Sequence, residues 1–272
     1  MTTTGTTRLS LAISLLAGDA PPADRVARAV SSGYRVLESW WPWPEPAPAP
    51  AELDAFVAAL ERHDARLHLL NLTEGAEAWG GRGVAGLPRA ADDFDANSAA
   101  ALDLGTRTGV RWLNVLAGNI PPEGRASGLA TLEERVLRLA ARAGRSRIGL
   151  VIEQLNPRDH PDYLLGDPHE TAELVAGWAA RADGEIALLA DVYHLTGSGA
   201  DPESFVREHA ALIGHVQLAD FPGRGRPGTG GIAIGRILTV LERAGYSGMI
   251  GLEYLPDGAL PAPEDIWKEI VA

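Results

Sequence analysis

The amino-acid sequence predicts an α/β protein that folds as a single (β/α)8 TIM barrel. Eight short apolar runs alternate with amphipathic segments, a pattern that indicates parallel strands joined by helical crossovers. The chain has 272 residues, which is close to the usual size of eight such units. A doubly wound open sheet is the alternative. Such sheets usually carry a G-x-G-x-x-G loop after the first strand, whereas residues 18–24 read GDAPPAD.

The apolar runs give the expected strands in order. They span residues 9–16, 35–40, 66–72, 111–118, 147–155, 186–194, 212–220 and 249–255. Amphipathic helices are expected between them, for example at residues 23–32, 51–63, 131–144 and 234–245. Gly33, Gly144 and Gly245 stand at the ends of three of these segments, where glycine often terminates a helix.

Two low-complexity segments are predicted to be loops. Residues 40–50, WWPWPEPAPAP, contain prolines that exclude a helix and suit an extended surface segment. Exposed Trp40, Trp41 and Trp43 would form an apolar wall over a site or a subunit contact, with ordinary packing of one of them as a third outcome. The Gly-rich residues 80–86 are expected to form a mobile loop.

The N-terminal residues precede the first expected strand. Residues 1–8 are predicted to be a flexible tail of one domain that spans residues 1–272. The apolar residues 9–18 resemble the core of a signal peptide, but a single basic residue precedes them and the barrel needs its first strand there. No stretch reaches the roughly 20 apolar residues of a membrane span. We therefore expect a cytoplasmic protein.

Composition excludes several classes of chemistry. The chain holds 24 Lys and Arg against 36 Asp and Glu, a net charge of −12 that is a poor match for nucleic acid or an anionic membrane. It has no cysteine, which excludes disulfides, thiolate nucleophiles and zinc–sulfur sites. Its one lysine, Lys268, lies in an expected surface helix, so Schiff-base chemistry is not expected.

Four consecutive expected strands end in oxygen-bearing side chains. These are Glu153, Asp191, Gln217 and Glu253, each following an apolar run. Catalytic groups of TIM barrels come from the carboxyl ends of the strands, and three carboxylates cannot share a dry site without a cation. An all-oxygen set suits a hard divalent ion, Mg²⁺ or Mn²⁺. In the alternative, each of these residues simply begins a polar loop, and this coincidence would have to occur on four neighbouring strands.

Several stretches carry a family resemblance. They include GYRVLESWWPW at 33–43, IEQLN at 152–156, DVYH at 191–194, GHVQLADFPGRGRPGTG at 214–230 and GYSGMIGLEYLP at 245–256. From about residue 9 to 256, the chain resembles hydroxypyruvate isomerases of the xylose-isomerase-like TIM-barrel superfamily.

The resemblance implies roles for the strand-end residues. It makes Glu153, Asp191, Gln217 and Glu253 the ligands of the divalent metal. It also makes Glu153 and Glu253 the acid–base pair of the reaction. Gln217 is informative because the sugar epimerases of the superfamily usually have histidine at this position.

Three further residues are candidates for substrate binding. The resemblance favours Arg224 over Arg226 as the cationic contact for a substrate carboxylate, although both are solvated arginines in the alternative view. His194 either contacts a substrate oxygen, orients Asp191, or is an ordinary loop histidine. Asn71 either positions a hydroxyl group or forms a turn.

Other polar residues of the strands are expected around the site rather than in it. His215 and His68 are expected in the core or beneath the ligands. Glu38 is expected to form a hydrogen bond near the site, without binding the metal.

The implied reaction is the conversion of hydroxypyruvate to tartronate semialdehyde through an enediolate. Two positions depart from the family pattern. Gly81 stands where the family usually has Glu, and residues 231–234 read GIAI where it usually has Glu-Ile-Asn-Tyr, so the identity of the substrate stays open. The alternatives are a 2-oxo-tetronate isomerase, a ketose 3-epimerase and a non-catalytic barrel that binds a sugar acid. The expected partner is a small hydroxy-keto acid or sugar, and a homo-oligomer is left open. A zinc phosphodiesterase similar to apurinic endonucleases is disfavoured by the acidic charge and scattered histidines.

Overall fold

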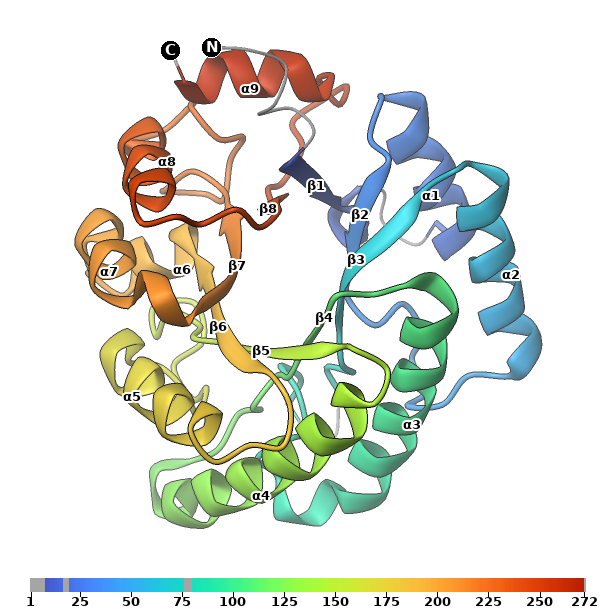
Figure 1. Ribbon diagram of the computed structural model, residues 1–272, viewed down its shortest axis with the longest axis vertical. Helices are drawn as coiled ribbons and strands as arrows, with labels where there is room; N and C mark the ends of the chain where they lie inside the picture. The colour runs from blue at the N-terminus through green and yellow to red at the C-terminus, as the bar shows by residue number, and fades with distance from the viewer. Residues whose placement is uncertain (1–7, 17–19, 76–79, 272) are drawn as a thin grey trace.

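The computed structural model describes residues 8–16, 20–75 and 80–271 and confirms the predicted barrel. Eight parallel strands close in sequence order, with β8 paired to β1, and the helices surround them (Figure 1). The strands are β1 Leu9–Ala12, β2 Val36–Ser39, β3 Arg66–Asn71, β4 Trp112–Asn114, β5 Gly149–Glu153, β6 Ile186–Asp191, β7 Ile213–Leu218 and β8 Ile250–Leu252.

The helices of the described residues form the outer layer. They are α1 Pro22–Ser31, α2 Pro50–Arg62, α3 Ala91–Thr108, α4 Arg125–Gly144, α5 Pro168–Ala179, α6 Val192–Gly197, α7 Pro202–His209, α8 Ile234–Arg243 and α9 Pro263–Val271. Short 3-10 turns lie at η2 Ile13–Leu15, η4 Pro88–Ala90, η5 Pro122–Gly124 and η6 Ala210–Leu212. None of the helices within the described ranges is both long and apolar enough to span a membrane.

Alternation along the strands decides which side chains enter the barrel. Leu69, Trp112, Val151, Ala187 and Leu189 form a small buried cluster, separate from the main core that the helices cover. Successive side chains of a strand point to opposite faces, so the residue two positions later shares the inward face. Asn71, Asn114, Glu153 and Asp191 each stand two residues after a member of this cluster. The same period therefore places an apolar floor in the barrel and polar groups above it.

Several expected strands end earlier than predicted. The expected strand 9–16 is β1 followed by the turn η2, and the expected strand 186–194 stops at Asp191. There the Asp191 carboxylate accepts hydrogen bonds from the backbone N–H groups of Tyr193 at 2.8 Å and His194 at 3.4 Å. These bonds cap the first turn of α6, because the first N–H groups of a helix have no partner within it.

The three glycines predicted to end helices lie at or just beyond the observed helix ends, but only two of them take the left-handed conformation. Gly33 and Gly245 follow α1 and α8 with positive φ angles of 97° and 83°, a conformation that suits glycine. After α4, by contrast, Gly144 is the last helical residue, and Arg147 takes the left-handed conformation with φ of 59°. Of the tail predicted at residues 1–8, residues 1–7 lie outside the described residues, whereas Arg8 is anchored. Arg8 donates hydrogen bonds to the carbonyl oxygens of residues 246 and 248.

Both low-complexity loops are better packed than the sequence indicates. Trp41 and Trp43 are buried and stack edge to face at 5.0 Å, so the expectation of exposed side chains is wrong for both. In the Gly-rich loop, the Gly83 N–H donates to the Glu74 carbonyl at 2.8 Å. A side chain at Gly83 would overlap the backbone of Leu116. Close backbone contact, which glycine permits, thus holds the described part of this loop against the barrel mouth.

Candidate active site

The four predicted strand-end residues converge at one end of the barrel. Glu153 and Asp191 end β5 and β6, Gln217 lies in β7 directly opposite Asp191, and Glu253 follows β8. Their exposed fractions are only 4%, 2%, 2% and 3%. Glu153 and Glu253 border a cavity of about 20 Å³, roughly the space of one water molecule or ion. The prediction that these strands bring oxygen atoms together inside the barrel agrees with this geometry.

Glu153 is a carboxyl group with little neutralising charge around it. Its Oε2 accepts a hydrogen bond from Asn114 Nδ2 at 2.7 Å. Burial raises its pKa well above the usual value, and the charges of Glu253 and Asp191 raise it further. Such a group holds a proton more strongly than an exposed glutamate, which suits a residue that gives and takes protons.

The two carboxylate oxygens of Asp191 differ in their hydrogen bonding. Oδ1 caps α6, whereas Oδ2 is buried and accepts no hydrogen bond from the described residues. The nearest cation to Oδ2 is Arg224, whose Nη2 lies 3.5 Å away. Burial raises the pKa of Asp191 to about 7, with Arg224 opposing this shift and Glu253 adding to it. Oδ2 is therefore available to a ligand.

Glu253 is held between a tryptophan and an arginine. Its Oε1 accepts a hydrogen bond from Trp40 Nε1 at 2.5 Å, and its Oε2 lies 3.0 Å from Arg224 Nη2. Burial raises its pKa, although Arg224 and the Trp40 hydrogen bond act against the shift. Trp40 therefore forms part of a wall at the site, one of the two predicted roles for this loop.

Arg224 reaches the carboxylates from the loop after β7. Its Nε donates to the backbone carbonyl of Glu253 at 3.1 Å, and its guanidinium lies 5.4 Å from the centre of the Tyr193 ring. Arg226, by contrast, pairs with Glu269 of α9 at 3.4 Å. The structure thus directs Arg224, and not Arg226, toward the site, and the contact of Arg224 with a substrate carboxylate stays a prediction. Arg224 is paired with Asp191 and Glu253, a contact that the sequence did not predict.

A buried network beneath the site orients Gln217. Gln217 Nε2 donates to Glu38 Oε2, and His215 Nε2 donates to Glu38 Oε1, both at 2.8 Å. Ser10 also donates to this carboxylate. Burial acts to raise the pKa of Glu38, but His215 and these hydrogen bonds outweigh it, and the net shift is downward. Because ionised Glu38 only accepts hydrogen bonds, it takes the amide nitrogen of Gln217. The Oε1 atom of Gln217 is then left without a hydrogen-bond partner among the described residues.

His194 and Asn71 lie beside the carboxylates. His194 Nδ1 accepts the backbone N–H of Asn156 at 3.2 Å, which leaves the proton on Nε2, 3.9 Å from Asp191 Oδ2. Burial, with Arg224 and other cations, holds the His194 pKa well below its usual value, so the ring is neutral. Asn71 is buried and borders the cavity, and its Oδ1 has no hydrogen-bond partner within the described part of the chain. Both residues can offer hydrogen bonds to a bound molecule.

The comparisons with known proteins agree with this arrangement. The family described as Xylose isomerase-like TIM barrel matches residues 26–272. The chain belongs to this family. A Streptomyces coelicolor protein provisionally named hydroxypyruvate isomerase is 36% identical over 270 residues, which cover 96% of this chain and 95% of that protein.

Two further relatives of this xylose isomerase-like chain are 30% identical over 250 residues, covering 92% of this chain and 93% of each relative. They are the hydroxypyruvate isomerase of Escherichia coli and the 2-oxo-tetronate isomerase of Cupriavidus necator. Together these relatives confirm the prediction of a hydroxypyruvate isomerase-like enzyme.

Solved structures share the barrel. One from Brucella melitensis, described as an AP endonuclease of family 2, has a TM-score of 0.82 and 25% identity and covers 94% of this chain and 95% of its own. A D-psicose 3-epimerase has a TM-score of 0.75 and covers 96% of this chain and 89% of its own, but its identity is 17%, which indicates the fold alone.

The oxygen atoms of the site fit the divalent metal that is common in this family. Asp191 Oδ2 and Gln217 Oε1 are buried, and no described residue donates a hydrogen bond to either. Glu153 and Glu253 are close to them with raised pKa values. Carboxylate and amide oxygens are the ligands that Mg²⁺ and Mn²⁺ prefer. Glu153, Asp191 and His194 also bring ligand atoms within 4.8 Å of one another. The Nε2 proton of His194 favours a hydrogen-bonding role for this residue.

Several residues near the site were not predicted. Asn114 holds Glu153, and Asn156 sets the tautomer of His194. Arg82 and His160 border the cavity, and Arg82 pairs with Glu74 at 2.9 Å. Asn114 was detectable as a polar residue within an apolar run. The others depend on loop conformations that the sequence pattern does not encode.

Proposed function

We propose that this chain is a divalent-metal-dependent isomerase of a small 2-oxo-3-hydroxy acid, with hydroxypyruvate as the first candidate and tartronate semialdehyde as its product. The observation that carries the proposal is the group of three buried carboxylates and one oriented amide at the ends of β5 to β8. The names of the relatives support the same reaction class.

The metal would be held by Glu153, Asp191, Gln217 and Glu253, and the unpartnered oxygens of Asp191 and Gln217 support this assignment. When bound, Mg²⁺ or Mn²⁺ would supply a positive charge that polarises the substrate carbonyl and orients the neighbouring hydroxyl oxygen. The protein contributes buried carboxylates and an amide of fixed orientation, because Glu38 accepts a hydrogen bond from the amide nitrogen of Gln217.

Glu153 and Glu253 would move the proton. Isomerisation of hydroxypyruvate removes a proton from C3, and the C–H electron pair forms the C2–C3 double bond of an enediolate. A proton then returns at C2, while the hydroxyl proton passes from the oxygen on C3 to the oxygen on C2. One glutamate takes the carbon-bound proton and the other completes the transfer. The raised pKa of each carboxyl group brings it nearer to the working pH of such a step.

Substrate recognition would fall to Arg224, His194 and Asn71. Arg224 is the cation closest to the carboxylates and can pair with the substrate carboxylate. The Nε2 proton of His194 and the side chain of Asn71 can contact hydroxyl or carbonyl oxygens. Arg82 also borders the cavity, where its charge is paired with that of Glu74.

Two alternatives keep the same acid–base groups. A 2-oxo-tetronate substrate has one more carbon and the same carboxylate, and the Cupriavidus necator relative carries that name. A ketose 3-epimerase would use neutral sugars, which offer Arg224 no substrate carboxylate to pair with. A barrel that binds a sugar acid without catalysis would show no proton exchange.

The proposed setting is the cytoplasm, with a small molecule as the partner and with neither nucleic acid nor membrane. The net charge of −12 supports the exclusion of nucleic acid.

The test is an NMR screen in D₂O with Mg²⁺ and then Mn²⁺ added to metal-free protein. Hydroxypyruvate, 2-oxo-tetronate and neutral ketoses such as D-psicose are each incubated with the wild type and with Glu253→Gln. We expect deuterium to enter carbon-bound positions of the acids, with turnover to the isomer and loss of both in the variant. Faster conversion of ketoses would move the assignment to the epimerases. Exchange into none of the compounds would support a binding barrel.

A further inference from the structure

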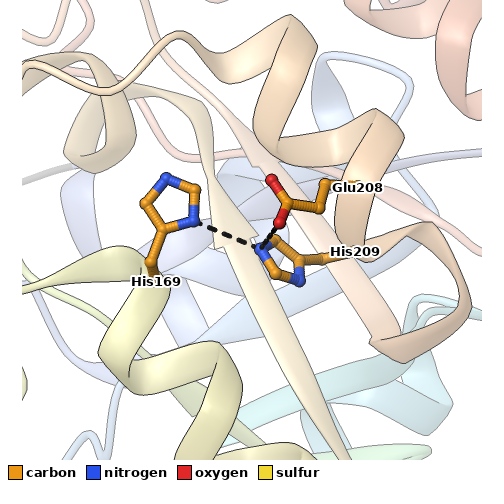
Figure 2. A group of neighbouring side chains, drawn as sticks. All are labelled: His169, Glu208 and His209. Atoms are coloured by element: carbon orange, nitrogen blue, oxygen red, sulfur yellow. Dashed lines mark hydrogen bonds and ion pairs between the residues drawn. The ribbon is translucent and has the colours of Figure 1, made fainter.

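Two imidazoles and a carboxylate meet on the outside of the barrel, between α5 and α7. His169 lies in the first turn of α5, and Glu208 and His209 end α7 (Figure 2). One ligand atom of each side chain lies within 4.8 Å of the other two. We call these three residues the α5–α7 cluster. None of its members contributes to the proposed isomerase site.

The spacing within the cluster suits a tetrahedral ion. His169 Nδ1 and His209 Nε2 face each other at 3.4 Å, as the dashed line in Figure 2 marks. Zinc–nitrogen bonds of about 2.0–2.1 Å place two tetrahedral ligands about 3.3–3.4 Å apart. A direct hydrogen bond is usually shorter, at about 2.9–3.0 Å.

Glu208 completes the set with a small movement. Its Oε1 lies 4.0 Å from His209 Nε2, and its side chain is 63% exposed and free to turn inward. Two histidines, one carboxylate and one water are a common ligand set for zinc.

The two imidazoles are already held in place. Buried Phe205, one turn before His209 on α7, packs against both rings, at 4.6 Å from His209 and 5.5 Å from His169. Burial lowers the pKa of His209, with Glu208 opposing and His169 adding to the shift. The ring of His209 is therefore neutral at pH 7, which is the form that binds a metal.

We propose that the α5–α7 cluster binds a divalent transition metal, Zn²⁺ in the first place, through His169 Nδ1, His209 Nε2 and a Glu208 oxygen. Imidazole ligands favour Zn²⁺, Ni²⁺ and Cu²⁺, whereas the oxygen-only set inside the barrel favours Mg²⁺ and Mn²⁺. A bound ion ties the start of α5 to the end of α7 and stabilises the folded chain by mass action. The inference goes beyond the proposed isomerase activity and does not depend on it.

The experiment compares zinc bound per chain in three proteins. They are the wild type, the double variant His169→Gln/His209→Gln, and the control His63→Gln, which removes an imidazole beyond the end of α2 on the other side of the barrel (Figure 1). Each is stripped with chelator and dialysed against ZnCl₂. Zinc in the barrel is common to all three, so the comparison isolates the cluster.

We expect the double variant to bind one zinc fewer than the wild type and the control. Zn²⁺ should raise the melting temperature of the wild type more than that of the double variant. Equal zinc counts in all three proteins would overturn the proposal. If the melting temperature of the double variant without zinc differs from that of the wild type, the single variant Glu208→Gln, at an exposed position, is used to test the proposal instead. It should weaken zinc binding about tenfold or more, and unchanged affinity would likewise overturn the proposal. Isomerase turnover, measured with Mg²⁺, tests only the proposed function.

Discussion

Glu38→Gln tests whether a carboxylate beneath the barrel mouth sets the orientation of a metal ligand. Glu38 accepts hydrogen bonds from Ser10, His215 and Gln217. Glutamine at this position keeps the shape but replaces one acceptor oxygen with an amino group. The N–H donor of either His215 or Gln217 then faces the new amide N–H group at position 38 instead of an acceptor oxygen. Gln217 can relieve that conflict by turning its amide over, which would present its nitrogen to the metal site.

The expected magnitude follows from the hydrogen bonds that the substitution breaks. A hydrogen bond to a charged group contributes about 1.5–3 kcal/mol, and at least one of the three is broken, so the free energy of unfolding should fall by about that amount. A turned amide removes one oxygen ligand from the ion. Loss of a group that orients a ligand typically weakens metal binding about 10–100-fold, which is about 1.4–2.7 kcal/mol.

The assay is calorimetric titration of metal-free protein with Mn²⁺, alongside urea unfolding. Glu61→Gln, an exposed change on α2, is the matched control and should leave both quantities unaltered. A general loss of packing would lower the unfolding free energy while leaving the Mn²⁺ affinity of the folded protein near wild type. That result would refute the orienting role of Glu38, because only a change at Gln217 reaches the ion.

Three further predictions concern the residues above Glu38. Glu153→Gln and Glu253→Gln should each lower turnover about 10²–10⁴-fold with an unchanged circular dichroism spectrum; a variant that keeps more than about a tenth of wild-type turnover at saturating metal has not lost a general base. In the metal-free protein, burial raises the pKa of Asp191 from 3.8 to about 7, so the folded state binds this proton more tightly than the unfolded chain. The contribution of Asp191 to stability is then present below about pH 4 and declines as pH rises to about 7. The difference in unfolding free energy between wild type and Asp191→Asn should show this decline, and a flat difference would contradict the raised pKa. Arg224→Met should cost about 1.5–3 kcal/mol in kcat/KM for acid substrates and little for neutral ketoses; equal losses would mean that Arg224 mainly supports Glu253.

The fold could be predicted because each element has a local signal. Alternation of apolar runs and amphipathic segments identified all eight strands, and the family match covers residues 26–272. The strand-end residues followed from the same pattern. Glu153 and Asp191 stand two positions beyond Val151 and Leu189, so the period that buries the apolar pair also directs the acids inward.

The rest of the site could not be predicted because it depends on chain closure. Trp40 reaches Glu253 across 213 positions of sequence, and the two come together because β8 pairs with β1 and β1 pairs with β2. The end of β6 was placed three residues too late, since its apolar run continues into α6. The strand ends there because the Asp191 carboxylate caps α6 by accepting hydrogen bonds from backbone N–H groups. Such capping cannot be recognised in the pattern of apolar residues.

Arg224 connects the electrostatics of the site to its choice of substrate. Three buried carboxyl groups face one guanidinium, which lies 3.0 Å from Glu253 and 3.5 Å from Asp191. With the carboxyl groups ionised, this leaves two negative charges without compensation. Burial is the main cause of the raised pKa values of these groups, and the repulsion between carboxylates adds to it. A divalent ion would supply two compensating positive charges, and Arg224 would then balance the third carboxylate. The guanidinium has five N–H donors, so Arg224 can keep its contact with Glu253 and also donate to a substrate carboxylate. A neutral ketose offers Arg224 no carboxylate, so we expect the charge-assisted hydrogen bonds of Arg224 to favour acid substrates at this site.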